Sequence, residues 1–154
     1  MAKLFYDTVH TVNSRDYAKE QLNAWATGNV DIDAWNSSLM AHNTLIAEID
    51  GLIVGFADMD DTGYLDRLYV HKDYQRRGIA LALLKQLELS AQKAGISSFT
   101  THASITAIPF FEKQGYKVVA ENRVVRNGVT LLNYKLVKNA TVSKDKSYPS
   151  DNDK

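Results

Sequence analysis

The chain has 154 residues, of which 45% are hydrophobic and 10% aromatic, a composition typical of one folded domain rather than a disordered segment. Eighteen basic residues balance eighteen acidic ones, so no overall charge draws the chain to nucleic acid or to an anionic membrane. The sequence contains no cysteine, which excludes disulfides, thiolate zinc sites and a cysteine nucleophile.

Helical periodicity dominates the first part of the chain, where apolar residues recur at the spacing of one helix face. Asn13 or Ser14 could cap the second of the predicted helices, and Asp31 or Asp33 could cap the third. The three predicted helices cover residues 1–12, 14–26 and 31–42.

Residues 43–70 predict three consecutive strands, because apolar and aromatic residues recur there between short polar turns. Asp50-Gly51 is a residue pair favoured in two-residue hairpin turns, so the first two strands should be antiparallel neighbours. Asp60 and Asp61 begin a looser turn before the third strand, and we interpret both as turn formers.

The clearest periodicity follows Gly78, where a helix with one apolar face runs to Gly95, a residue typical of helix C-termini. The strands on either side of this helix should be parallel, because such a connection makes a right-handed crossover. The polar, aperiodic residues 139–154 predict a disordered tail behind a single domain of residues 1–138. The remaining predicted elements are a strand at 97–104, a short helix at 105–115 and a hairpin at 116–138 turned by Asn127-Gly128.

Two arginines and a glycine stand directly before the long helix. The first N–H groups of a helix lack intrahelical partners and carry partial positive charge, so a phosphate can accept hydrogen bonds there. Gly78 has no Cβ and Ala80 has only a methyl group, which lets a ligand approach the main chain. Arg76 and Arg77 could meet a further phosphate. The alternative is an ordinary strand–loop–helix turn with two solvated arginines.

The segment LDRLYVHKDYQRRGIALALL resembles the acetyl-coenzyme A signature of the GNAT superfamily of N-acetyltransferases. The Gln/Arg-x-x-Gly-x-Gly/Ala pattern of that family corresponds here to Gln75, Gly78 and Ala80. ASITAIPFFEKQGYKVV resembles a second landmark, a short helix that ends in Gly-aromatic before a strand. The resemblance covers residues 43–138, and DYAKEQLNAWA extends it to a bacterial subgroup of uncharacterised members.

The resemblance implies an α/β (α+β) fold, with a twisted, mixed, mostly antiparallel sheet and helices on both faces. Chains of this family usually begin with a strand, whereas this sequence begins within a helix, so the usual first strand is expected to be absent. A sheet edge left open in this way would expose unpaired main-chain groups. Either the sequence is truncated before this helix, or another segment covers the edge, for which we expect a partner chain, as in a homodimer, or the C-terminal tail.

The resemblance also implies that acetyl-coenzyme A is the acetyl donor. The main chain of residues 68–70 would pair with the pantetheine arm as if with another strand, and the amides of residues 75–80 would hold the pyrophosphate. The cofactor-binding residues expected on this basis are Leu68, Tyr69, Val70, Gln75, Arg76, Arg77, Gly78, Ile79, Ala80, Ser104 and Phe111.

The implied reaction moves the acetyl group to a primary amine of a small molecule or a protein, by direct transfer in a ternary complex. The backbone N–H of Leu68 is the expected oxyanion donor. For the general base, His102 ends a strand beside the cofactor and is the type of side chain that titrates near neutral pH. Asp66 is the other candidate. The alternatives are a hydrogen-bonded histidine at a strand end and a surface ion pair between Asp66 and Arg67 or a lysine.

The general acid departs from the family pattern, because the position of the usual tyrosine is Phe111. Tyr116, Tyr69 or water could replace it. The missing tyrosine keeps an alternative function open, a non-catalytic sensor or interaction module that binds acetyl-coenzyme A. A nucleotide-binding domain of another kind is disfavoured, because no G-x-x-x-x-G-K-[ST] loop occurs.

The acceptor pocket should lie between the N-terminal helices and the late hairpin. We expect no metal, because the histidines lack metal-ligand spacing, and neither nucleic acid nor a membrane as partner. The absence of cysteine, of a long apolar stretch and of a signal peptide predicts a cytoplasmic protein. We interpret four large aromatic residues as core: Trp25, Trp35, Phe110 and Phe111.

Overall fold

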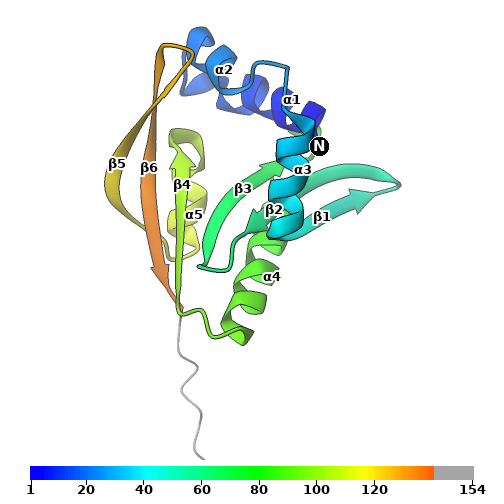
Figure 1. The fold of residues 1–154 in the computed structure, drawn as a ribbon, viewed down its shortest axis with the longest axis vertical. Helices are drawn as coiled ribbons and strands as arrows, with labels where there is room; N and C mark the ends of the chain where they lie inside the picture. Colours follow the sequence, from blue (N-terminus) through cyan, green and yellow to red (C-terminus); the bar gives the residue numbers. More distant parts are fainter. Residues whose placement is uncertain (141–154) are drawn as a thin grey trace, which may run out of the picture.

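A six-stranded sheet in the order β1-β2-β3-β4-β6-β5 forms the centre of the computed structural model, which describes residues 1–140 (Figure 1). All neighbouring strands are antiparallel except β3 and β4, which are parallel, as the crossover helix between them predicted. The strands are β1 (Asn43–Ile49), β2 (Leu52–Met59), β3 (Tyr64–Val70), β4 (Ser98–Ser104), β5 (Lys117–Arg126) and β6 (Val129–Asn139). The expectation of a mixed, mostly antiparallel sheet is confirmed.

Helices cover both faces of this sheet (Figure 1). On one face, Leu84 and Leu87 of the long helix pack with Phe99 and Leu136 of the strands. On the other face, the first two helices form a second apolar cluster around Val9. The α-helices are α1 (Ala2–Val12), α2 (Lys19–Trp25), α3 (Ile32–Ala41), α4 (Ile79–Lys93) and α5 (Ile108–Lys113); short 3₁₀ turns are η1 (Asn13–Arg15), η2 (Lys72–Tyr74) and η3 (Ile105–Ala107).

The predicted cap of the second helix was wrong. Asn13 and Ser14 lie in η1, and α2 begins only after Ala18, whose N–H donates to the Gln21 side chain at 2.8 Å. The reason is that Asn13 is buried and its side chain points to Ser104 in another element, so it is not available as a cap. Of the two caps predicted for the third helix, Asp31 is the one observed. Its side chain accepts a hydrogen bond from Ala34 N–H at 3.0 Å.

The two predicted hairpin turns are present. Asp50-Gly51 has φ values of 50° and 78°, and Asn127-Gly128 has 50° and 75°, the positive pair that a type I′ turn requires. Strand β6 reaches Asn139, one residue past the predicted domain boundary, and residues 141–154 of the predicted tail lie outside the described part of the chain. Strands β1 and β5 form the two edges of the sheet, and the homodimer across an open edge stays a prediction.

Gly55 sets how closely α4 approaches the sheet. A Cβ at this position would lie 2.9 Å from Ile79 Cγ2 and 3.2 Å from Leu83 Cδ1, so only glycine lets the start of the helix pack on β2. The N-terminus of α4 is thereby held beside the end of β3. Among residues 1–140, no helix combines the length and the apolar character needed to cross a bilayer.

Candidate active site

The two parallel strands β3 and β4 are paired over only two residue positions. Tyr64 lies opposite Thr100 and Leu65 opposite Thr101, and the Thr101 hydroxyl donates to Leu65 O at 2.9 Å. Beyond these pairs the register ends, although both strands continue. The main chain of β3 after Leu65 therefore faces a gap instead of a neighbouring strand.

Leu68 and Val70 direct their main-chain N–H groups into this gap. His71 N–H donates to Val54 O of β2 at 2.7 Å. Successive N–H groups along a strand point to opposite sides of it, so every second N–H group points toward β2. The N–H of Leu68 therefore points away from β2. The carbonyl oxygen of Val70 is occupied, since it accepts from the Thr8 hydroxyl at 2.9 Å and the Gln75 amide at 2.7 Å.

A cavity of about 710 Å³, here called the β3–β4 cavity, fills the gap and extends to the N-terminus of α4. This helix has 15 residues, no acidic residue in its first turn and no side chain that caps it. Its first N–H groups are therefore free to bind an anion. The predicted cofactor residues that line this cavity are Leu68, Tyr69, Val70, Gln75, Arg76, Gly78, Ile79, Ala80, Ser104 and Phe111.

The loop before α4 adopts an uncommon backbone conformation. Gly78, the N-cap, has φ +80°, and Arg76 has φ +59°, a left-handed value that few residues other than glycine adopt. No atom lies within 4 Å of the place that a Cβ of Gly78 would occupy. Gln75 braces the loop through hydrogen bonds from its amide to Val70 O and His71 O. The main chain of this turn is thus fixed and open to a ligand.

Arg77 is the predicted cofactor residue that the structure places elsewhere. Its guanidinium stacks on the Tyr74 ring at 4.8 Å, and it does not line the β3–β4 cavity. The residue lies between two left-handed positions, Arg76 and Gly78, which direct its side chain away from the cavity that its neighbours line. Arg76 does line the cavity, so one of the two arginines remains available for a phosphate.

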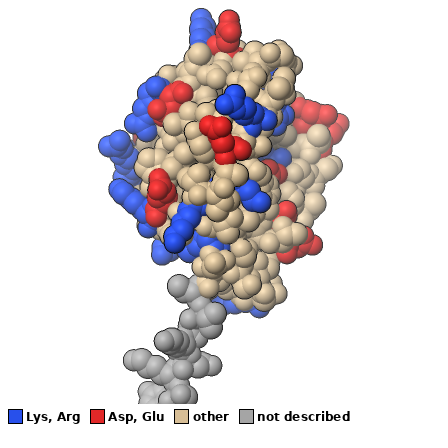
Figure 2. All heavy atoms as spheres, turned by 90° about the vertical axis from the view of Figure 1, so that its left-hand side faces the viewer, with Lys and Arg blue, Asp and Glu red and all other residues tan. Residues whose placement is uncertain are grey.

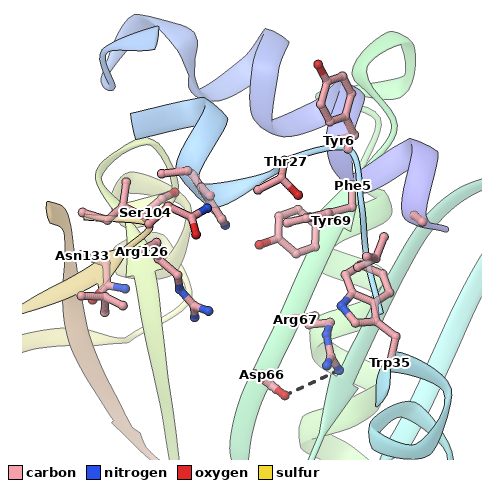
Figure 3. Close-up of a pocket in the computed structure, with 18 of the residues that line it drawn as sticks. Phe5, Tyr6, Thr27, Trp35, Asp66, Arg67, Tyr69, Ser104, Arg126 and Asn133 are labelled. Carbon is pink, nitrogen blue, oxygen red and sulfur yellow. Dashed lines mark ion pairs between the residues drawn. The ribbon is translucent and has the colours of Figure 1, made fainter. Parts of the chain in front are cut away.

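A second cavity of about 920 Å³ lies between the N-terminal helices and the end of the β5–β6 hairpin, and is here called the helix–hairpin cavity (Figure 3). Phe5 and Tyr6 come from α1 and Trp35 from α3, while Arg126 and Asn133 come from the hairpin. This is the region in which the sequence placed an acceptor pocket.

The two cavities meet where β3 and β4 separate. Five residues line both of them: Trp25, Asp66, Tyr69, His102 and Ser104. The two candidates for a general base, Asp66 and His102, therefore lie where contents of the two cavities would come together.

His102 is exposed, and its Nδ1 lies 2.9 Å from the hydroxyl of Tyr64. Burial, helped by the nearby charge of Asp66, raises the pKa of the Tyr64 phenol, so its hydroxyl stays neutral near pH 7. The imidazole is thus held by one ring nitrogen while the other is left for a substrate. Nothing in the sequence indicated a role for Tyr64, because only the pairing of β3 with β4 brings it next to His102.

Asp66 belongs to a charged cluster under α3. Its carboxylate lies 3.5 Å from Arg67 Nη1 and 4.0 Å from His42 Nδ1. Both partners also bind the fully buried Asp58, at 2.6 Å for Arg67 and 2.7 Å for His42. Burial raises the pKa of Asp58, while the His42 hydrogen bond and the Arg67 charge oppose that shift.

His42, Asp58 and Asp66 bring three ligand atoms within 4.8 Å of one another, which is also the spacing of a metal site. The guanidinium of Arg67 already supplies a cation to the two carboxylates. We therefore interpret the group as an ion-pair network, and the expectation of no metal stays a prediction.

Tyr116 is poorly placed to be the general acid. The residue is 2% exposed and packs against Phe111 and under Lys138, and it lines neither cavity. Burial, together with the charge of Glu88, raises the pKa of its phenol, and in the described part of the chain no group is within hydrogen-bond geometry of its hydroxyl. Phe111 does line the β3–β4 cavity but has no proton to give. Tyr69 lines both cavities, and burial raises its pKa as well.

The aromatic residues assigned to the core also form cavity walls. Trp25 lines both cavities, Trp35 the helix–hairpin cavity, and Phe110 and Phe111 the β3–β4 cavity. Asn13 is a further contributor that the sequence did not reveal, since its amide donates to the Ser104 hydroxyl at 3.3 Å. On the β5–β6 side of the molecule, lysine and arginine are interspersed with aspartate and glutamate (Figure 2).

Comparisons with known proteins agree with this architecture. Residues 13–138 match a family model described as an acetyltransferase (GNAT) domain. The chain is 36% identical over 134 residues to the uncharacterized N-acetyltransferase YafP of Escherichia coli K12, which covers 87% of this chain and 84% of the relative. A GCN5-related N-acetyltransferase structure from Rhodopseudomonas palustris is 36% identical, with a TM-score of 0.86 over 90% of this chain and 86% of that one. The PaiA N-acetyltransferase of Thermoplasma acidophilum, solved with coenzyme A, shares the fold at 18% identity, with a TM-score of 0.70 over 90% and 89%.

Proposed function

Because this chain belongs to the GNAT family of acetyltransferases, we propose that it moves an acetyl group from acetyl-coenzyme A to a primary amine of a small molecule or a protein, directly and in a ternary complex. The observation that carries this proposal is the meeting of two cavities at Asp66, Tyr69, His102 and Ser104. One cavity has the features of a donor site and the other is open to an acceptor. Direct transfer also agrees with a sequence that has no cysteine to hold an acyl group.

The residues of the β3–β4 cavity fit acetyl-coenzyme A. The left-handed turn at Arg76 and Gly78, with free space where a Cβ would stand, exposes amides to a diphosphate. The inward N–H groups of Leu68 and Val70 suit an extended amide chain, which could pair with β3 as a strand does. When bound there, the donor supplies a thioester, whose acyl carbon an amine can attack and whose thiol leaves readily at a pKa near 8.5.

The protein must remove a proton from the acceptor. An alkyl ammonium with a pKa of about 10.4 is roughly three units above neutral pH, which costs about 4 to 5 kcal/mol unless a base or desolvation helps. We assign this role to His102, because within residues 1–140 its side chain is hydrogen-bonded to Tyr64 alone, whereas Asp66 is engaged by Arg67 and lies near His42. The base nitrogen would be Nε2, which requires Nδ1 to carry its hydrogen and donate it to the Tyr64 oxygen.

The N–H of Leu68 is the group proposed to stabilise negative charge on the carbonyl oxygen. It faces the gap from a strand fixed on its other side by β2, so it needs no reorganisation during the reaction. No side-chain acid is assigned to the departing thiolate, since Phe111 cannot donate and Tyr116 lines neither cavity.

Thiol release from acetyl-coenzyme A, measured over a panel of amines, tests the proposal. Amine-dependent release that is lost in His102→Gln, with acetyl-coenzyme A binding retained, is the expected result. Tight binding of acetyl-coenzyme A without thiol release across the panel would instead support the sensor, which the missing tyrosine at Phe111 favours.

A further inference from the structure

We propose that the helix–hairpin cavity selects a primary amine that also carries a carboxylate and an aromatic or apolar body, and that Arg126 recognises the carboxylate. This inference rests on the proposed function for the amine itself. It adds a substrate class and a residue that determines specificity.

One wall of the cavity is aromatic. Phe5 packs on Trp35 with ring centroids 5.3 Å apart and on Tyr69 at 4.9 Å, so the three rings hold one another in place. Figure 3 shows them on the side of the cavity opposite Arg126 and Asn133. Rings fixed in this way offer apolar surface at low cost in conformational entropy.

Among the described residues of the cavity wall, Arg126 is the cation without a carboxylate partner. Lys3 is paired with Asp7 at 2.6 Å, and Arg67 is paired with Asp58 and Asp66. Arg126 has no carboxylate within 4.0 Å among the described residues. The remaining acid of the wall, Asp31, caps α3. Since Asp31 also lies on the wall and Arg67 faces two carboxylates, the cavity as a whole has no excess of positive charge, but a ligand carboxylate that reaches Arg126 is favoured there.

Asn133 adds a directed hydrogen-bond donor to the hairpin wall of the cavity. Its side-chain oxygen accepts from Asn122 at 2.8 Å, so its own NH₂ group is left to donate. Figure 3 shows Asn133 and Arg126 on the same side of the cavity, and in the strand register Asn133 lies opposite Asn122, four residues before Arg126. The planar fork of guanidinium donors on Arg126 suits a carboxylate, which accepts two hydrogen bonds in one plane, and the Asn133 amide can donate to another polar group of the same ligand.

The hairpin that carries Arg126 is fixed over the cavity. The Tyr17 hydroxyl donates to Leu132 O at 2.7 Å, the Gln21 amide donates to Thr130 O at 3.2 Å, and Leu131 is buried under α1 and α2. Arg126 is the last residue of β5 before the type I′ turn, opposite Val129. Its exposed side chain therefore starts from a main chain that is held by the N-terminal helices.

The test compares acids with their matched amides. Thiol release is measured for phenylalanine against phenylalanine amide, and for para-(aminomethyl)benzoate against its carboxamide. We expect wild type to use each acid better than its amide, because the KM for the acid is lower. In Arg126→Gln the acid-to-amide ratio of kcat/KM falls about tenfold, and Arg126→Lys recovers part of it.

Arg123→Gln is the matched control, since Arg123 lies on the same strand, is exposed and lines neither cavity. Its acid-to-amide ratio should equal that of wild type. Equal use of acids and amides by wild type, or an unchanged ratio in Arg126→Gln, overturns the inference.

Direct binding separates this inference from the proposed function. Binding of phenylalanine and of its amide to the protein saturated with coenzyme A is followed by NMR titration. Arg126-dependent preference for the acid, without turnover of any amine, would uphold the recognition site while the acetyltransferase proposal fails. Turnover of amines with no Arg126-dependent preference would do the reverse.

Discussion

The phenol of Tyr64 and the imidazole of His102 meet at 2.9 Å across the two strands whose separation forms the β3–β4 cavity. Tyr64 begins β3, and His102 stands one residue past Thr101, the last residue of β4 that is paired with β3. The contact therefore holds the imidazole at the mouth of the gap, where both cavities can be reached.

His102→Gln should lower kcat about 10²- to 10⁴-fold at neutral pH, because the amide cannot take a proton from the acceptor. The dissociation constant for acetyl-coenzyme A should stay within a factor of about two of wild type. Steady-state kinetics and calorimetry measure the two quantities. A larger kcat loss in Asp66→Asn than in His102→Gln would transfer the role of base to Asp66.

Tyr64→Phe should alter the pH dependence of kcat/KM more than its maximum. The phenol orients the imidazole through Nδ1, where a hydroxyl can either donate or accept, so its loss removes this hydrogen bond and shifts the balance between the two tautomers of the ring. The measurement is a pH–rate profile. Superimposable profiles for the variant and wild type would show that Tyr64 does not position the base.

Gly78→Glu should raise the dissociation constant for acetyl-coenzyme A about tenfold or more, since it places a negative charge at the phosphate end of α4. Gly95→Glu is the control, because Gly95 also has positive φ, at +88°, and open space at its Cβ, but lies past the other end of the same helix. Both variants should lose roughly 1 to 2 kcal/mol of unfolding free energy from the left-handed backbone. Equal loss of binding in the two variants would contradict the phosphate site.

Asp58→Ala should lower the unfolding free energy by about 3 to 5 kcal/mol, because it leaves Arg67 and His42 without their buried partner. Asp7→Ala removes an ion pair of the same length, but Lys3 is 88% exposed, so the loss should stay below about 1 kcal/mol. Urea denaturation compares the two. Similar losses would mean that burial adds nothing to the Asp58 network.

Asp60 should make stability depend on acid pH. Partial burial raises its pKa, but hydrogen bonds from Thr62 and Tyr64 outweigh that effect and lower the pKa below its ordinary value of 3.8. A lowered folded-state pKa contributes stability that is present above 3.8 and is lost as the pH falls through the folded value. Unfolding of wild type should therefore show this loss at acid pH, and Asp60→Asn should not.

Asp61→Asn is the control for Asp60. Asp61 is exposed in the same turn, and it takes no part in the hydrogen bonds from Thr62 and Tyr64 that Asp60 accepts. Its acid profile should follow that of wild type. Loss of the acid dependence in this variant too would point to the general charge of the turn.

Local sequence signals predicted the parts of the fold that depend on few neighbours. Asp50-Gly51 and Asn127-Gly128 predicted their turns because the backbone conformation is set by the two residues themselves. The periodicity after Gly78 predicted α4, and the crossover rule then gave the parallel strands on either side of it.

The differences between expectation and structure concern which way a side chain points. Tyr116 follows the short helix of the second landmark in the sequence, yet it is buried and lines neither cavity, and Arg77 is turned away by the left-handed residues beside it. Asn13 has the chemistry of a helix cap but reaches a distant serine. Arg126 gave no signal at all, because its place over a cavity depends on how α2 binds the hairpin.

Because the β3–β4 pairing ends early, binding of the donor should affect the stability of the sheet. A sheet whose central ladder stops short has amides at Leu68 and Val70 that no neighbouring strand protects from solvent exchange. A donor that takes the place of the absent strand would slow deuterium uptake there and raise the melting temperature by mass action. Saturating coenzyme should thus act as a structural member of the sheet as well as a reactant.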